Sequence, residues 1–270
     1  MKAGVAAIPT IRRRALLASA VLGAGGVRAA EDHTGGDPLG SMQWPTLRRQ
    51  YLGQAPMRFA PEVLVKGPAF ADDAMAVPLQ VDARALAGEG GGIERIFVVV
   101  DRNPVREVLD FEPLRALPMI AFRIRMEQAS PVRAMVRTRD GRWHVGGTWV
   151  QAAGGGCTVP GATRADGSWS RTLNQVQTRW FDNLIDGSRR LRLRVMHPMD
   201  TGLVAGIPAF FIERLQLDDG AGQPLWRLAL HEPVAENPLI TLELPTGVRG
   251  GLRLHGRDNN GNRIDAEVVS

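Results

Sequence analysis

The single cysteine of the chain, Cys157, follows three consecutive glycines, Gly154, Gly155 and Gly156. Glycine is the most costly residue to order and adopts φ values that other residues avoid, so the run predicts a flexible tether. A thiolate is a nucleophile that forms covalent bonds to sulfur and other electrophiles. We therefore expect an unburied thiol on a mobile arm, suited to holding a covalently attached group.

A lone cysteine leaves three interpretations. It has no internal disulfide partner, so it either pairs between two copies, as a disulfide-linked homodimer through Cys157, or remains a reactive thiol. The usual alternative is an inert cysteine buried in a core. The glycine-rich setting argues against burial and favours the reactive thiol.

The sequence favours a carrier role for this thiol over a catalytic one. A Cys–His nucleophile needs a histidine oriented beside the sulfur, and the nearest in sequence, His144, precedes the glycine run. Productive geometry is hard to hold on a flexible arm. We therefore expect a carrier that is not itself an enzyme, with a thiol hydrolase or transferase as an alternative.

Metal and cofactor motifs are not evident. The five histidines form no His-x-x-His pair and no cluster with the cysteine, so we expect no metal site. The glycine-rich stretches lack Walker or Rossmann context, and no Gly-x-Ser-x-Gly motif occurs, so we expect no cofactor. The histidines are His33, His144, His197, His231 and His255.

Residues 1–30 have the pattern of an export signal. Three arginines, Arg12 to Arg14, precede a short apolar run over 15–27, and small residues follow at Val27-Arg28-Ala29. Consecutive arginines favour the Tat route to the periplasm. About 13 weakly apolar residues are too few to span a bilayer, so we expect no membrane anchor after the signal is removed.

The charge of the chain also depends on this segment. Residues 1–30 hold five of the 33 basic residues and no acidic ones. The remaining 28 basic residues balance the 28 acidic ones, so the exported chain is formally neutral. The basic pI therefore gives no support to nucleic-acid binding.

The arm must be positioned by the β-rich segments on either side of it. Residues 31–43 are polar and predict disorder, and helical spacing follows over 44–52. Between residues 62 and 150, about seven short runs of strand character are separated by turn residues, which predicts an immunoglobulin-like β-sandwich. We assign residues 44–157 to this first domain, which ends in the glycine arm.

The remaining chain predicts a linker and a second sandwich. Residues 158–187 are assigned to the linker, with a helix over 168–184 on an apolar stripe at helical spacing. Residues 188–270 form the second, smaller sandwich, because short strand-like runs continue without alternating helices. The predicted fold class is all-β, with two immunoglobulin-like β-sandwich domains joined by a linker with a short helix. The stripe residues are Trp169, Leu173, Val176, Trp180 and Leu184.

Two sets of motifs resemble the SoxY and SoxZ families of sulfur-oxidation proteins. Residues 71–78, the Asp101-Arg102-Asn103-Pro104 turn and the Gly-Cys end resemble SoxY. The sequence from Met196 to Gly202, Met-His-Pro-Met-Asp-Thr-Gly, is the most specific match to SoxZ, and residues 210–213, 233–238 and 258–261 support it in the same order.

This resemblance implies a periplasmic carrier that holds sulfur intermediates covalently during thiosulfate oxidation. Cys157 would be the attachment residue and Gly154 to Gly156 its tether, and the partners would be sulfur-oxidation enzymes of the Sox type. The fused arrangement also resembles carriers associated with quinoprotein dehydrogenases. A non-enzymatic accessory or binding module for such a dehydrogenase is therefore the alternative.

The chain departs from the family pattern after the cysteine. Where the family arm ends in Gly-Gly-Cys-Gly-Gly, Thr158 and Val159 follow Cys157 here and the chain continues. A cysteine on an internal loop can enter a partner only together with two chain segments. Either the partner enzymes have wider channels than a free arm needs, or the thiol has a different function. Arg164 and the start of the expected 168–184 helix are candidates for lowering the pKa of the thiol.

Overall fold

The computed structural model describes Met1 and residues 32–182, 187–248 and 250–269. The expected export signal over residues 1–30 lies outside these residues except for Met1, so its assignment stays a prediction. Across the described ranges, no helix is both long enough and apolar enough to cross a bilayer. All the elements below belong to one folded unit that begins at His33.

The N-terminal half of this unit, which ends at Cys157, is built mainly of short strands. One helix, α1 (Trp44–Tyr51), precedes them, and two 3₁₀ turns lie at Arg84–Leu86 and Glu89–Gly91. The strands are β1 (Met57–Phe59), β2 (Leu64–Lys66), β3 (Phe70–Ala71), β4 (Val77–Asp82), β5 (Ile93–Val100), β6 (Glu107–Glu112), β7 (Met119–Ile124), β8 (Ser130–Thr138) and β9 (Trp143–Ala152).

The C-terminal half begins with the segment that connects the two sandwiches. This segment holds two single-turn helices, α2 (Ala162–Ala165) and α3 (Trp169–Thr172). The strands are β10 (Val176–Phe181), β11 (Arg189–Val195), β12 (Ile212–Asp218), β13 (Pro224–Leu230), β14 (Leu239–Leu244), β15 (Leu252–Asp258) and β16 (Arg263–Val268).

Side-chain patterns explain why these segments form strands. In β11, Leu191 and Leu193 are buried while Arg192 and Arg194 are exposed, as the two-residue period of a strand requires. By contrast, β5 is apolar on both faces. Its outer face is covered by α1, in a cluster that includes Trp44, Leu47, Phe97, Val99 and Met135.

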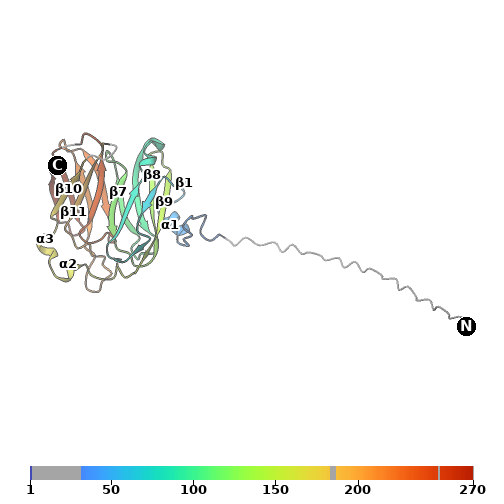
Figure 1. Cartoon of the computed structure of the whole chain (residues 1–270). Helices are drawn as coiled ribbons and strands as arrows, with labels where there is room; N and C mark the ends of the chain where they lie inside the picture. The colour runs from blue at the N-terminus through green and yellow to red at the C-terminus, as the bar shows by residue number, and fades with distance from the viewer. Residues whose placement is uncertain (2–31, 183–186, 249, 270) are drawn as a thin grey trace. The chain divides into compact units, whose positions relative to one another are not determined.

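The strands form two sheets that both continue from one half into the other (Figure 1). The larger sheet has the order β1-β9-β8-β5-β6-β13-β12-β15-β16, with β3 also paired to β9. The smaller sheet has the order β10-β11-β14-β7-β4-β2. The halves join where β6 pairs antiparallel with β13 and where β7 pairs antiparallel with β14.

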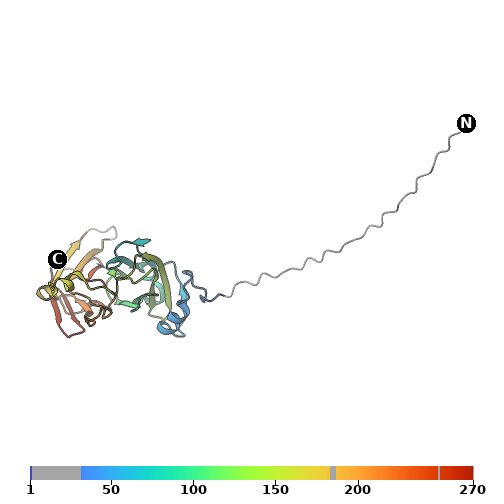
Figure 2. The same ribbon diagram turned by 90° about the horizontal axis from the view of Figure 1, so that it is seen from below.

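The predicted all-β fold with two immunoglobulin-like sandwiches is therefore confirmed, and the structure adds that the sandwiches share both sheets. Their buried apolar residues form one continuous cluster across the junction. Figure 2 looks onto the end of the sandwich where the segment with α2 and α3 crosses from one half to the other. The two halves are thus packed as one body.

The predicted helix over residues 168–184 is wrong beyond Thr172. Asn174 has a left-handed φ of +61°, which ends the helical path, and β10 then pairs antiparallel with β11. The sequence Val-Gln-Thr-Arg-Trp-Phe is rich in β-branched and aromatic residues, and it alternates between half-buried and exposed positions up to Trp180. The end of the predicted helix, residues 183–184, lies outside the described part of the chain.

The predicted disorder of residues 31–43 is also wrong at Asp37 and Ser41, which are buried. The Arg133 guanidinium donates to Asp37 at 2.6 and 2.7 Å and to Asp101 at 2.9 Å, in a fully buried triad. Burial alone would raise the pKa of Asp37, but the hydrogen bonds from Arg133 and from the Ser41 amide lower it overall. The polar N-terminal segment is thereby fixed to the sandwich.

We predict that Asp37→Asn lowers the free energy of unfolding by about 3 kcal/mol, because it leaves Arg133 partly unpaired in the core. Because the pKa of Asp37 is lowered in the folded state, this stabilisation is present above the unfolded pKa and is lost as the pH falls below about 4. Urea unfolding at neutral and acid pH measures both effects. Glu94→Gln, in the exposed pair with Arg137, is the control and should cost under about 1 kcal/mol.

We further predict that the two halves unfold together, because separating them would expose two sheet edges and the shared core. Hydrogen exchange in increasing urea, followed on peptides from β5 and β12, should show protection lost at the same urea concentration. Loss in one half while the other stays protected would contradict a shared body.

Candidate functional site

The cysteine lies in the loop between β9 and α2, and its side chain is buried. Cys157 is only 1% exposed, and Gly156 is buried beside it. The expectation of an unburied thiol is therefore wrong for this arrangement. The arm is folded back against the sandwich, where the segment after β7 and the loop around Ala74 cover it.

Hydrogen bonds hold the arm along its whole length. The Gly155 amide donates to the Glu127 carbonyl at 3.1 Å, and the Gly156 amide donates to the Met126 carbonyl at 3.0 Å. The Cys157 amide donates to the Glu127 carboxylate, also at 3.1 Å. From the other half, the Thr201 hydroxyl donates to the Cys157 carbonyl at 2.7 Å. The arm is thus docked by both halves.

The three glycines are required by this docked shape. Gly154 and Gly155 have φ values of +95° and +75°, which side chains rarely adopt. A Cβ added to Gly156 would lie 2.1 Å from the Ala74 carbonyl oxygen, so no larger residue fits there. The glycine run therefore allows close docking of the arm, and its role as a flexible tether stays a prediction.

The C-terminal half contributes the turn that carried the resemblance to SoxZ. Backbone hydrogen bonds between Asp200 and Phe210 close this turn, and the Met199 amide donates to Nδ1 of His197 at 3.1 Å. Burial lowers the pKa of His197 to about 4, although Asp258 opposes the shift. His197 is therefore a neutral structural acceptor that shapes the turn which presents Thr201.

Arg125, in the segment after β7, is hydrogen-bonded both to the end of the arm and to the turn of the C-terminal half. It is 1% exposed, and its guanidinium donates to the carbonyls of Val159 at 3.1 Å and Pro198 at 3.2 Å. Its Nε has no hydrogen-bond partner. Burial lowers the pKa of Arg125, and the charges of Glu236 and Asp200 oppose this shift. Neither Arg125 nor Glu127 was identified as a site residue from the sequence, because in residues 121–127 charged residues alternate with apolar ones, as on a strand with one exposed face.

The environment of the thiol opposes ionisation. Burial raises the pKa of Cys157 to about 12, the Glu127 carboxylate adds to this shift, and Arg125 opposes it. Arg164, which we expected to lower this pKa, instead pairs with Asp200 and stacks on Trp169. In the docked arrangement Cys157 is therefore a protonated and shielded thiol.

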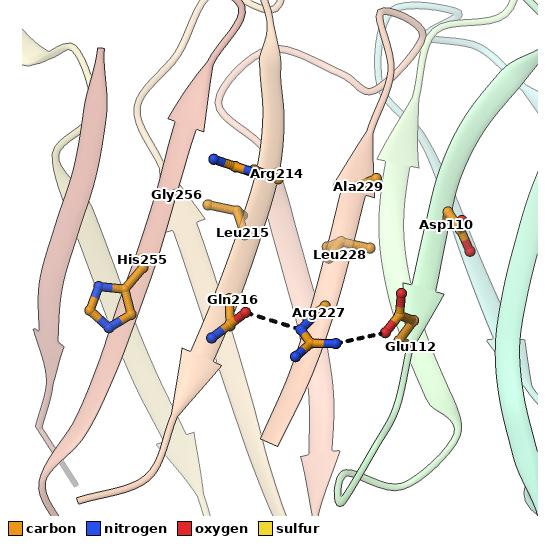
Figure 3. Close-up of a pocket in the computed structure, with 10 residues that line it drawn as sticks. All are labelled: Asp110, Glu112, Arg214, Leu215, Gln216, Arg227, Leu228, Ala229, His255 and Gly256. Atoms are coloured by element: carbon orange, nitrogen blue, oxygen red, sulfur yellow. Dashed lines mark hydrogen bonds and ion pairs between the residues drawn. The ribbon is translucent and has the colours of Figure 1, made fainter. Parts of the chain in front are cut away.

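A separate hollow of about 510 Å³ lies on the outer face of the larger sheet at the junction of the halves (Figure 3). Arg227 bridges Gln216 and Glu112 across β12, β13 and β6. His255 contacts Asp218 at 3.1 Å at the β15 side. The residues that line this hollow do not include Cys157, and no group of three potential metal ligands occurs among the described residues.

The fold and this site define a β-sandwich protein of two joined halves organised around one thiol on a glycine arm. Residues 48–157 match the family model of the sulfur oxidation protein SoxY, and residues 182–269 match that of the sulphur oxidation protein SoxZ. The chain belongs to this SoxY and SoxZ family of sulfur oxidation proteins, with both units fused in one polypeptide. The SoxY match ends at Cys157.

No curated protein matches the chain. Among solved structures, the chain is similar to the sulfur carrier protein SoxY from Chlorobium limicola f thiosulfatophilum, with 20% identity and a TM-score of 0.35 over 41% of this chain and 96% of that one.

We predict that the docked thiol reacts slowly. At pH 8, alkylation of Cys157 by iodoacetamide should be at least about tenfold slower in the native chain than in the urea-unfolded chain, because the thiolate is scarce and buried. Since the folded pKa is raised, docking is fully stable below about pH 9 and weakens as the pH rises toward 12. Equal rates in both states would contradict a docked arm.

Removing the hydroxyl of Thr201 should loosen the arm. We predict that Thr201→Val speeds this alkylation about fivefold, because one net hydrogen bond contributes about 1 kcal/mol. Thr246→Val is the matched control, since the Thr246 hydroxyl donates to the Gly187 carbonyl at an unrelated turn. A rate for Thr201→Val equal to that of the control would show that Thr201 does not hold the arm.

Proposed function

We propose that the chain is a periplasmic carrier that holds sulfur intermediates covalently on Cys157 during the oxidation of sulfur compounds such as thiosulfate. The observation that carries this proposal is the position of the only thiol in the sequence. It stands at the last residue of the SoxY match, on an arm that both halves of the fused protein hold. The proposed attachment residue is Cys157, and the proposed tether is Gly154 to Gly156.

The chemistry of attachment indicates what the partners supply. Joining the thiol to thiosulfate forms an S–S bond and releases two electrons and one proton, leaving an S-thiosulfonate on Cys157. With a single cysteine, the chain has no internal disulfide that could accept these electrons. The partners proposed for this step are therefore redox enzymes, either of the Sox type or a periplasmic quinoprotein dehydrogenase, and the carrier itself performs no catalysis.

We further propose that residues 1–30 are an export signal, which would direct the chain to the periplasm by the Tat route. A disulfide-linked homodimer through Cys157 would require the arm to leave its docked position, because the docked sulfur is almost fully covered.

A second candidate function is an accessory or binding module for a quinoprotein dehydrogenase, in which Cys157 is structural. The burial of Cys157 and the raised pKa of its thiol favour this alternative, since both are typical of unreactive cysteines. The two functions differ in whether the thiol is modified in the cell.

We predict that protein isolated from thiosulfate-grown cells, without reductant, carries mass additions of sulfur, sulfite or thiosulfate on the Cys157 peptide. Mass spectrometry before and after reduction measures them. Cells with Cys157→Ser should lose oxidation of the sulfur compound, while the neighbouring conservative change Thr158→Ser should spare it.

An unmodified Cys157 in these cells, together with normal sulfur oxidation by the Cys157→Ser strain, would refute the carrier. If deletion of the whole chain then impairs alcohol oxidation while Cys157→Ser does not, the accessory module is the function.

A further inference from the structure

Glu127 is the central contact of the docked arm. Its backbone carbonyl accepts the Gly155 amide, and its carboxylate accepts the Cys157 amide at 3.1 Å and the Thr158 hydroxyl at 3.3 Å. In the part of the chain that the structure describes, no cation forms an ion pair with this carboxylate. The Glu127 carboxylate therefore lies against the backbone of Cys157.

The docked site has little capacity for an attached anionic group. Cys157 is already 1% exposed, so additional atoms on its sulfur must either find space in the packed site or leave it. An oxyanion on the sulfur would lose its hydration and face the Glu127 carboxylate. The cation that acts on this thiol is Arg125, and its guanidinium already donates to the Val159 and Pro198 carbonyls and lies in the field of the Glu236 and Asp200 carboxylates.

Both ends of the arm have their own anchors. The Ala153 amide donates to the Ala71 carbonyl at 3.4 Å, and Arg125 holds the Val159 carbonyl. Release of the hydrogen bonds to Met126, Glu127 and Thr201 would therefore free residues 154–158 and leave the loop tied at each side. At roughly 3.3 Å per residue, the three steps from Gly154 allow Cys157 to extend about 10 Å.

From these contacts we propose that Glu127 makes docking of the arm specific for the free thiol. Glu127 holds the arm while Cys157 is unmodified, and it expels the arm once the sulfur bears an oxyanion, which then reaches partners at the surface. This proposal rests on the proposed function, because it assigns a consequence to the loading of Cys157. Glu127 acts here as a positioning residue that distinguishes loaded from unloaded carrier.

The test compares two adducts of the full chain that differ mainly in charge. With tetrathionate, the thiol attacks a sulfane sulfur, one S–S bond breaks, and thiosulfate and a proton leave, which gives the S-thiosulfonate. With methyl methanethiosulfonate, methanesulfinic acid leaves and a neutral methyl disulfide remains. Hydrogen exchange of the amides at Gly155, Gly156 and Cys157 then reports docking in each state.

We expect these three amides to be protected from exchange when Cys157 is a free thiol. Their exchange should be at least about tenfold faster in the S-thiosulfonate, with a smaller increase in the methyl disulfide. Glu127→Gln keeps an oxygen acceptor for the Cys157 amide and removes the charge. In this variant the S-thiosulfonate should exchange at least about fivefold more slowly than in the wild type. Glu94→Gln, in an exposed ion pair elsewhere, should leave the wild-type difference unchanged.

Equal amide exchange in the two wild-type adducts would show that the charge of the adduct does not matter. Protected amides in the S-thiosulfonate would show that the loaded arm stays docked. If the amides of the S-thiosulfonate exchange equally fast in Glu127→Gln and in the wild type, Glu127 does not expel the arm. Because the adducts are installed chemically, these outcomes do not depend on whether cells load Cys157. A failure of the proposed function would appear instead in the mass analysis of protein from cells.

Discussion

The pairing of β6 with β13 and of β7 with β14 is the constraint on which the rest of the structure depends. These ladders make the two sandwiches one body with a common core. The docking site for the arm exists only in that body, because Glu127 comes from one half and Thr201 from the other. Fusion keeps the halves at an effective concentration of order mM, so the site is maintained even at low expression.

A carrier thiol must satisfy two opposing demands, protection between reactions and access during them. The docked arm meets the first, since burial raises the pKa of Cys157 to about 12 and leaves little thiolate to react. The second demand requires the arm to leave its docked position. The hydrogen bonds to Met126, Glu127 and Thr201 are individually weak, and breaking them would expose only a short loop and no part of the main core.

The sequence was sufficient to predict the all-β fold class and the family of this protein. The strand-like runs expected in residues 188–270 are strands, as β11 illustrates, and the Met196 to Gly202 motif predicted the SoxZ half. The helix predicted over 168–184 is wrong beyond Thr172 because residues 176–180 fit both a helical stripe and an alternating strand, and pairing with β11 decides between them. Local spacing does not contain that long-range information.

Cys157 stays a prediction as the functional residue, and the residues that surround it in the structure were missed. A glycine run before a lone cysteine led to the prediction of a mobile arm, but glycine permits both freedom and close approach, and here Gly156 lies against Ala74. Arg125 and Glu127 sit in an alternating stretch that is typical of a solvent-exposed strand face. Only the packing of the second half against the first places Arg125 beneath the arm.

If Cys157 receives sulfur and passes it on, the adduct on Cys157 must form and be consumed while cells oxidise thiosulfate, and a pulse of labelled thiosulfate measures both steps. Cells oxidising an unlabelled sulfur compound would be given a brief pulse of isotopically labelled thiosulfate, then quenched at intervals for mass analysis of the Cys157 peptide. The account predicts that label appears on Cys157 and then declines as labelled product accumulates. Label that never appears there, or that stays while product forms, would contradict it.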